Sequence, residues 1–261
     1  MSDAANTNLT LRDEICEYWS MRAETFDLQP GHEIFSNSER GVWHELIARH
    51  FQKTKGNNVL DLACGTGVIT HLLDDLGFEA TGIDWSEAML AKAREKAKIR
   101  KRSITFLQGD AEETREPDET YDGLITRHLV WTLVDPQKAF QHWFKLLKPG
   151  GILLIIDGDF VTKNILEKAL NFAIRKFTTA SPAHSDVMRD RHQHILSQVY
   201  FSHGAKADEV KQLLTAAGFS DIEVQSDMSA IHREQAKAVG FLKSLSRRSQ
   251  HRYAIRATKA E

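Results

Sequence analysis

Four short polar stretches, each placed directly after an apolar run, carry residue types that can bind a ligand. They are, in chain order, Asp61 with the glycine turn at residues 63–67, Asp84, Asp110, and Thr126-Arg127-His128. Gly65 and Gly67 have no Cβ atom, so the backbone of the turn can approach a ligand closely. A helix expected from Val68 directs its free N–H groups and the positive end of its dipole at this turn. Such a site suits a polar or anionic group of a cofactor.

The glycine turn departs from the Gly-x-Gly-x-x-Gly pattern of dinucleotide-binding proteins. Counted from Ala63, the sixth position holds Val68, and Asp61 precedes the turn. A carboxylate there would repel a pyrophosphate but could help to hold a cationic amino group. Asp84 lies about 20 residues further on, where a carboxylate can take both hydroxyls of a ribose, and Asp110 could accept from adenine N6. This combination indicates a cofactor with an adenosine and an amino acid tail, which is S-adenosylmethionine.

These residues need parallel strands whose carboxyl ends share one edge of a sheet. Apolar runs predict strands over residues 57–63, 78–83, 104–107, 121–126 and 152–156. Helices are expected between them, over residues 68–76, 87–100 and 136–147, with Ser86 and Asp135 as N-caps. Residues 148–151 have the proline and glycine of a type II turn. The alternation predicts a doubly wound, Rossmann-like α/β fold, which binds ligands where the strand order reverses.

Charge and cysteine content narrow the class of protein. The 261 residues carry a formal net charge of −2, which argues against a protein built mainly to coat nucleic acid. Cys16 and Cys64 supply neither a disulfide framework nor a zinc spacing. The sequence shows no signal-peptide core and no apolar run of about 18–20 residues, so we expect a cytoplasmic protein without a membrane span.

Four motifs in this order resemble those of a known family. They are residues 59–67 (Val-Leu-Asp-Leu-Ala-Cys-Gly-Thr-Gly), 82–90 (Gly-Ile-Asp-Trp-Ser-Glu-Ala-Met-Leu), 109–111 (Gly-Asp-Ala) and 146–151 (Leu-Leu-Lys-Pro-Gly-Gly). Together they resemble class I S-adenosylmethionine-dependent methyltransferases of the small-molecule type, similar to the ubiquinone/menaquinone group. The resemblance covers residues 55–160 well and residues 208–224 more loosely. It departs at Ala63, where many relatives have glycine.

The resemblance implies a set of cofactor-binding residues. They are Tyr18, Arg22, Asp61, Ala63, Cys64, Gly65, Gly67, Asp84, Trp85, Met89, Gly109, Asp110, Ala111 and Arg127. Asp61 would help to fix the turn and the cofactor's amino group, to which Arg127 would offer its carbonyl. Asp84 would hold the ribose hydroxyls.

The adenine would lie between two apolar side chains. Trp85 and Met89 would flank its ring, and Asp110 and Ala111 would contact its edge. For Trp85 and Met89, ordinary core packing is the alternative.

The flanking segments are expected to complete one domain around this core. Helices are predicted over residues 9–26 and 38–51, and the first carries Tyr18 and Arg22, which either pack or close over the cofactor's carboxylate. Beyond residue 160 we expect a helix over 161–177, a polar connection over 178–203, a helix over 208–217, and strands over 220–225 and 253–258. The predicted parts are a helical lid (1–54), a cofactor-binding core (55–160), an acceptor cap (161–205), and the C-terminal strands of a seven-stranded, mostly parallel sheet (206–261).

The expected reaction is an in-line displacement at a sulfonium methyl, onto an O, N or S atom of a small-molecule acceptor. His128 is the candidate base, because it lies just past the fourth strand and histidine titrates near neutral pH. Packing, or orienting Asp135, is its alternative role. Trp131 is expected either to wall the acceptor pocket or to pack under the following helix.

Several alternatives remain at this level. His192 and His194 are two residues apart with no firm third ligand, so we expect solvated histidines and no metal. A non-catalytic protein that binds the same cofactor is one alternative, and a nucleic-acid or protein methyltransferase is a weaker one. The sequence after the fourth strand, Thr126-Arg127-His128-Leu129, lacks the Asn/Asp-Pro-Pro-Tyr signature of the nucleic-acid enzymes. No nucleic-acid partner is expected, and the chain is expected to be a monomer or a homodimer.

Overall fold

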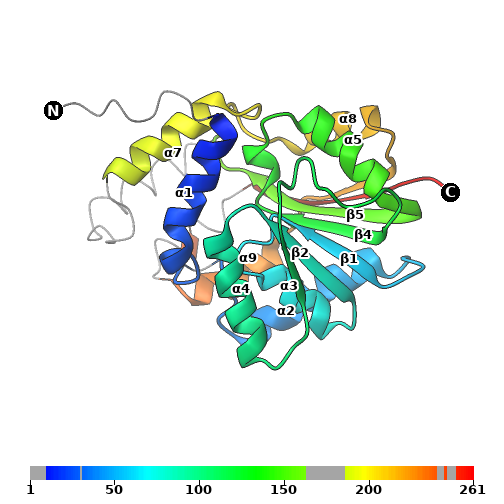
Figure 1. The fold of residues 1–261 in the computed structure, drawn as a ribbon, viewed down its shortest axis with the longest axis horizontal. Coiled ribbons are helices and arrows are strands. Elements are labelled where there is room, and N and C mark those ends of the chain that lie inside the picture. Colours follow the sequence, from blue (N-terminus) through cyan, green and yellow to red (C-terminus); the bar gives the residue numbers. More distant parts are fainter. Residues whose placement is uncertain (1–9, 30, 163–185, 240–243, 246–250) are drawn as a thin grey trace.

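A seven-stranded sheet forms the centre of the protein (Figure 1). The structure is a computed structural model that describes residues 10–29, 31–162, 186–239, 244–245 and 251–261. Its strands are β1 (Asn58–Leu62), β2 (Glu79–Asp84), β3 (Thr105–Gln108), β4 (Tyr121–Arg127), β5 (Leu147–Asp159), β6 (Ser220–Gln225) and β7 (His251–Thr258). They follow the order β3-β2-β1-β4-β5-β7-β6, and β7 runs antiparallel to β5 and β6 while the other pairs are parallel. The predicted Rossmann-like, mostly parallel sheet is confirmed.

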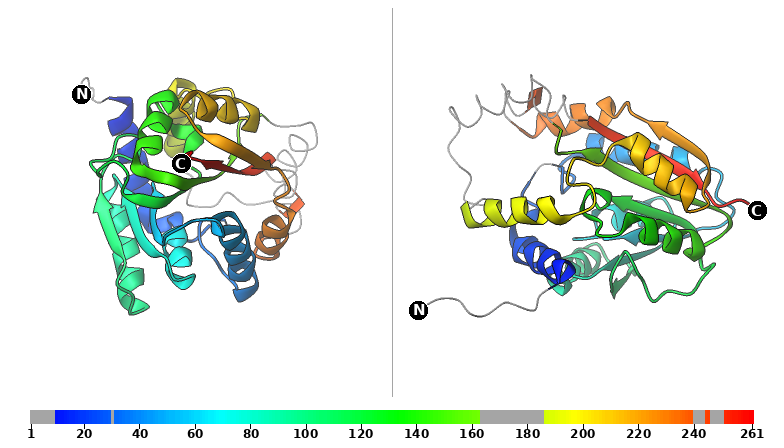
Figure 2. Two further views of the ribbon diagram at one scale, coloured as in Figure 1. Left: turned by 90° about the vertical axis from the view of Figure 1, so that its right-hand side faces the viewer. Right: turned by 90° about the horizontal axis from the view of Figure 1, so that it is seen from above.

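Helices cover both faces of this sheet, as the views in Figure 2 show. They are α1 (Leu11–Phe26), α2 (Asn37–Phe51), α3 (Val68–Asp75), α4 (Glu87–Ile99), α5 (Pro136–Leu146), α7 (Asp186–Gln198), α8 (Ala207–Ala216) and α9 (Ser229–Lys237). One core packs α5 and α8 on the sheet, and the other packs α2, α3 and α9. Because side chains alternate along a strand, Val59 packs into the α2 layer and its neighbour Leu60 into the α5 layer.

The strand order reverses between β1 and β4. Leu62, the last residue of β1, pairs with Ile83 of β2 on one side and Thr126 of β4 on the other. The chain then leaves β1 and β4 toward opposite faces of the sheet, which opens a crevice between their carboxyl ends. The four predicted polar stretches all meet at this edge.

Local sequence signals set the starts of α1, α4 and α5, and the caps of α4 and α5 are those predicted. The Ser86 hydroxyl accepts a hydrogen bond from the N–H of Met89 at the start of α4, and Asp135 caps α5 through the N–H of Lys138. Pro136 occupies the first turn of α5. The side chains of Thr10 and Asp13 form a capping box that begins α1.

The fifth strand is longer than predicted. β5 begins at Leu147, which pairs with Tyr121, and the register shifts before Ile152 pairs with Gly123. The predicted turn at residues 148–151 therefore forms an irregularity inside β5, with Gly150 at φ +77°. The strand continues to Asp159, because β7 pairs with it from Ile152 to Asp159.

The prediction for the chain after residue 160 was partly wrong. Residues 186–198 form helix α7 rather than a polar connection, and α7 lies beside α1 (Figure 1). Ile195 and Val199 pack with Ile15 and Tyr18. Helix α9 was not predicted either. Residues 163–185, which hold most of the helix expected over residues 161–177, lie outside the described residues. Within the described chain, no helix combines the length and apolar character needed to cross a bilayer.

Candidate functional site

A cavity of about 390 Å³ lies at the carboxyl ends of the central strands, between the sheet and helices α1 and α7. Its volume is in the range of small-molecule sites. The predicted residues that line it are Arg22, Asp61, Ala63, Cys64, Gly65, Asp84, Trp85, Met89, Asp110, Ala111, Arg127, His128 and Trp131. Tyr18, Gly67 and Gly109 are predicted residues that do not line it.

The two glycines of the turn have different surroundings. Gly65 has φ +56°, and a Cβ atom there would meet only the ring edge of Phe26, at 3.9 Å. Gly67 has φ +79°, and a Cβ there would come within 3.0 Å of Ala93 and 3.1 Å of Phe106. Gly65 thus gives the cavity access to the backbone, whereas Gly67 lets the turn pack on α4 and β3. Ala63 also has a positive φ, +56°, a conformation that favours glycine.

Asp84 connects the glycine turn to helix α4. One carboxylate oxygen accepts the N–H of Gly65 at 2.9 Å, and the other accepts the N–H of Ser86 at 2.9 Å. Burial raises the pKa of this carboxyl to about 6, although both backbone bonds favour the charged form. Each oxygen can accept a second hydrogen bond, so the carboxylate fits a pair of vicinal hydroxyls.

Asp61 is buried beneath the turn. Its carboxylate accepts a hydrogen bond from the Thr70 hydroxyl at 2.6 Å. Burial raises its pKa to about 7, while Thr70 and the charge of Arg127 act in the opposite direction. A cationic group entering the cavity would favour the ionised form of Asp61, which fits an amino group.

The residues predicted to contact an adenine lie where β2 and β3 end. Met89 is buried, and Trp85 is half-buried against the α1 side of the cavity. The carbonyl of Ala111 accepts the indole N–H of Trp143 at 2.7 Å, which fixes this loop on α5. Gly109 does not line the cavity, and a Cβ there would meet Ile83 at 2.8 Å.

Arg22 and Tyr18 contact each other at the α1 side. The guanidinium of Arg22 donates to the Tyr18 hydroxyl at 3.1 Å and lies over the Trp19 ring at 5.1 Å. Arg22 lines the cavity, and Tyr18 supports it from the core between α1 and α7. The Arg127 side chain donates to the carbonyl of His32 at 3.0 Å.

His128 lies at the other end of the cavity. It has a left-handed backbone with φ +61°, and its N–H donates to the carbonyl of Ile156 at 3.0 Å. The Trp131 indole N–H donates to the His128 carbonyl at 2.9 Å. The His128 ring meets the Phe160 ring edge to face at 5.4 Å. Of the described non-glycine residues with a positive φ, only Ala63 and His128 line the cavity, whereas Lys101, Glu119 and Asp221 lie outside it.

Several residues of this end were not predicted as site residues. They are Phe160, His192, Leu196 and Arg252, together with Trp19 from α1. Phe26 of α1 also lines the cavity, beside Gly65 of the glycine turn. Trp131 contacts three rings of this group edge to face. The distances between ring centroids are 6.3 Å to Trp19, 6.0 Å to Phe160 and 5.5 Å to His192. Phe160 follows β5 directly, so the rule that ligands bind beyond strand ends could have found it. His192 could not be found, because its helix was not predicted.

The two histidines considered as metal ligands point to different surroundings. His192 stacks on Tyr18 at 5.5 Å, while His194 is exposed and approaches Glu14 at 3.7 Å. Among the described residues, no group of three metal-ligating side chains comes together.

The polar and apolar groups that line this cavity fit S-adenosylmethionine, the methyl donor predicted from the sequence. Three carboxylates, Asp61, Asp84 and Asp110, line one end of the cavity together with a glycine backbone and the apolar side chains of Trp85 and Met89. These groups match an amino group, a ribose, an adenine amine and an adenine ring. Asp84 in particular holds the turn and the start of α4 while keeping acceptor capacity toward the cavity.

Comparison with known proteins agrees with this geometry. A family model described as a methyltransferase domain matches residues 53–218. A demethylmenaquinone methyltransferase of Paenarthrobacter aurescens is 25% identical over 85% of this chain and 86% of its own length. The ubiquinone/menaquinone biosynthesis C-methyltransferase of Pasteurella multocida is 29% identical over 81% of this chain and 80% of its own.

A solved structure shares the fold. Phosphoethanolamine N-methyltransferase 2 of Haemonchus contortus, solved with phosphomonomethylethanolamine and S-adenosylhomocysteine, has a TM-score of 0.66 and 17% identity. The alignment covers 97% of this chain and 61% of that one, so this chain spans less than two thirds of its length. The family model, which covers more than half of the chain, decides the assignment. The chain belongs to the methyltransferase domain family and is a class I S-adenosylmethionine-dependent methyltransferase.

Proposed function

We propose that this enzyme methylates a flat, aromatic small molecule that carries a phenolic hydroxyl, as a hydroquinone does. The observation that carries the proposal is the ring-lined end of the cavity, where Trp131 contacts Trp19, Phe160 and His192. Aromatic rings favour edge-to-face and offset contacts with another aromatic ring. An aromatic acceptor could therefore pack against these rings, whose apolar surfaces exclude water from this end of the cavity.

The named substrates of the relatives support the same class. The Paenarthrobacter aurescens relative acts on a demethylmenaquinone, and the Pasteurella multocida relative is a C-methyltransferase of quinone biosynthesis. A quinone ring in its reduced form is flat and carries two phenolic hydroxyls. The sequence predicts methyl transfer to an O, N or S atom, and this stays a prediction. The proposal adds a fourth possible acceptor atom, a ring carbon activated by a neighbouring phenolate.

In this proposal the two ends of the cavity have separate roles. Asp61 would bind the amino group, Asp84 the ribose hydroxyls and Asp110 the adenine amine, while Gly65 opens the turn to the methionine part. Trp85 and Met89 would hold the adenine ring, and Arg22 would face the carboxylate. The bound cofactor supplies a methyl group already activated on a sulfonium, so the protein mainly has to align the acceptor with it.

His128 would take the proton from the acceptor hydroxyl. The resulting phenolate is a better nucleophile, both at its oxygen and at the adjacent ring carbons. The rings of Trp131 and Phe160 would keep the acceptor plane facing the methyl group and keep water out. Helices α1 and α7 would act as the lid and the acceptor cap, because Trp19 of α1 and His192 of α7 line the same end.

The test uses S-adenosylmethionine with a deuterated methyl group and a set of matched acceptors, read by mass spectrometry. The set pairs a reduced 1,4-naphthoquinol with its oxidised quinone, and adds phosphoethanolamine as a non-aromatic acceptor. We expect label in the naphthoquinol and none in the quinone or the amine. Label in phosphoethanolamine alone would contradict the aromatic class. Tight binding of S-adenosylhomocysteine with no transfer to any acceptor would favour a binding protein instead.

A further inference from the structure

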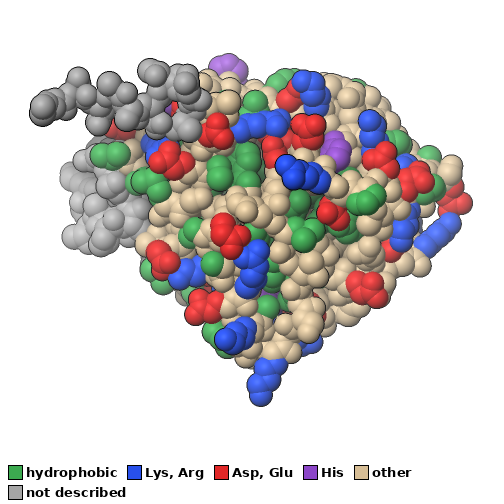
Figure 3. Space-filling view, viewed as in Figure 1, with side chains coloured by type: hydrophobic (Ala, Val, Ile, Leu, Met, Phe, Trp, Pro, Cys, Tyr) green, Lys and Arg blue, Asp and Glu red, His purple; other side chains and the backbone are tan. Residues whose placement is uncertain are grey.

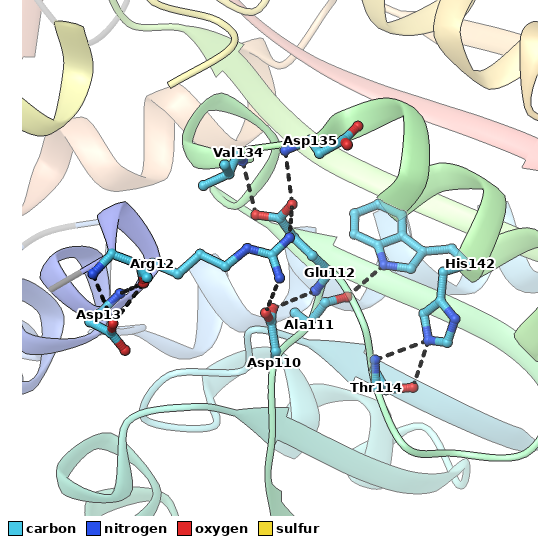
Figure 4. Close-up of polar contacts among 11 residues, drawn as sticks. Arg12, Asp13, Asp110, Ala111, Glu112, Thr114, Val134, Asp135 and His142 are labelled. Atoms are coloured by element: carbon cyan, nitrogen blue, oxygen red, sulfur yellow. Dashed lines mark hydrogen bonds and ion pairs between the residues drawn. The ribbon is translucent and has the colours of Figure 1, made fainter. Parts of the chain in front are cut away.

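Arg12, in the first turn of α1, joins this helix to the two carboxylates that follow β3. One guanidinium nitrogen lies 2.9 Å from Asp110 Oδ2, and another lies 3.1 Å from Glu112 Oε2. Figure 4 shows the side chain extending from α1 into the gap between them. The partners are 98 and 100 residues away in the sequence, so this contact fixes the position of α1 on the core.

Asp110 receives two hydrogen bonds that set its orientation. Arg12 binds Oδ2, and the backbone N–H of Glu112 donates to Oδ1 at 2.8 Å. Asp110 also lines the cavity. Each carboxylate oxygen keeps a second lone pair with which it can accept from a ligand.

Glu112 extends the contact to the acceptor end. Its side chain is only 5% exposed, and it accepts the backbone N–H groups of Val134 at 2.9 Å and Asp135 at 3.0 Å. This loop directly follows the 3₁₀ turn of Val130–Thr132, which holds Trp131. Through Asp110 and Glu112, Arg12 therefore connects α1 to the loop after β3 and to the loop before α5 (Figure 4).

The charges explain why an arginine stands here. Two carboxylates two residues apart repel each other, and burial of Glu112 strengthens that repulsion. A guanidinium offers N–H groups in a planar fork, so it can bind both carboxylates at once, whereas a lysine ammonium is a point charge. The Arg12 side chain is 33% exposed, so its ion pairs with Asp110 and Glu112 are partly shielded from solvent.

We propose that Arg12 is a positioning residue that holds the Asp110 carboxylate in the orientation that reads the 6-amino group of the adenine. The inference rests on the proposed function, since it takes Asp110 as the adenine contact. By the same contact, Arg12 holds α1, with Trp19 and Arg22, across the cavity. It touches neither the cofactor nor the acceptor itself.

The test compares two ligands that differ at the ring position that Asp110 reads and at the adjacent N1, which carries a proton only in the second ligand. S-adenosylhomocysteine has an amino group at that ring position, and S-inosylhomocysteine has an oxygen, which a carboxylate repels. Calorimetry gives the ratio of their dissociation constants, the adenine preference, for the wild type and for Arg12→Ala, Arg12→Lys and Asp110→Asn. A purely structural role of Arg12 would weaken both ligands by the same factor and leave this ratio unchanged.

We expect Arg12→Ala to reduce the adenine preference about tenfold. Arg12→Lys should retain part of this preference, and Asp110→Asn should abolish it. Arg94→Ala is the matched control, because Arg94 pairs with Glu87 on the surface of α4 and does not line the cavity. A preference that is lost in Asp110→Asn but unchanged in Arg12→Ala would overturn this inference alone. A preference unchanged in both would overturn it together with the adenine role of Asp110. Arg12→Gln replaces Arg12→Ala if the alanine variant fails to fold.

Discussion

The indole N–H of Trp131 donates a hydrogen bond to the carbonyl of His128 at 2.9 Å, within a turn where His128 has φ +61°. The ring expected to act as a base and the ring expected to wall the acceptor are therefore held by one local structure. Asp157 supports it from below, because its buried carboxylate accepts the N–H of Val130 at 2.7 Å. The geometry of this end of the cavity therefore depends on the turn and on its hydrogen bonds to β5.

Replacing His128 by asparagine tests its role as a base. Asparagine tolerates a positive φ better than most residues, so the turn is expected to keep its shape. We expect kcat to fall by about 10²–10⁴-fold, because that is the usual contribution of a positioned base. Binding of S-adenosylhomocysteine, measured by calorimetry, should stay unchanged. A variant with wild-type kcat would assign His128 to packing only.

Cofactor affinity should depend on pH through Asp84 and Asp61. Burial raises their pKa values to about 6 and about 7, and both must be ionised to bind hydroxyls and an amino group as proposed. As the pH falls through these values the carboxyls take up protons, so the dissociation constant of S-adenosylhomocysteine should rise. Calorimetry from about pH 5 to about pH 8 measures it. Asp84→Asn should bind weakly at every pH and lose the step near pH 6, whereas a wild type with no pH dependence would contradict the assignment.

Asp157 should make the unliganded protein less stable as the pH rises. Burial raises its pKa to about 7, well above the value of about 3.9 for an unfolded chain. Between these values the folded state binds more protons than the unfolded state, so stability present below about pH 4 is lost toward pH 7. The share of Asp157 is on the order of 4 kcal/mol. Denaturant unfolding of the wild type and Asp157→Asn should show a shallower pH slope for the variant, and equal slopes would contradict this.

The two glycines of the turn should differ in what they affect. Gly67→Ala would place a Cβ atom 3.0 Å from Ala93 in a left-handed conformation, so we expect a loss of about 1–3 kcal/mol in unfolding free energy. Gly65→Ala has room, with its nearest contact at 3.9 Å, so it should cost less stability but weaken S-adenosylhomocysteine binding. Thermal unfolding and calorimetry on both variants measure the difference. The reverse order of stabilities would show that the turn packs differently.

The core of the fold was predictable because its signals are local. The β1 strand, the glycine turn and the caps at Ser86 and Asp135 each lie within a few residues of sequence, and propensity, period and capping agree there. The positions of Asp61, Asp84 and Asp110 in the cavity were predictable from the rule that ligands bind beyond the carboxyl ends of the strands.

The parts that were missed depend on contacts between distant segments. Helix α7 is rich in charged and histidine side chains, and only a narrow stripe that includes Ile195 packs on α1, so its sequence resembles a polar connection. Arg12 and Glu112 meet across 100 residues, and no local pattern signals such a pair. The charge pattern itself offers little guidance, because acidic and basic side chains are interspersed on the face shown in Figure 3.

The most direct test of the site is a crystal structure of the complex with S-adenosylhomocysteine. We predict the ribose hydroxyls within hydrogen-bond distance of Asp84, the adenine between Trp85 and Met89, and the sulfur facing the space between His128 and Trp131. A ligand bound elsewhere, or one whose ribose lies away from Asp84 with its sulfur turned from His128, would contradict the account.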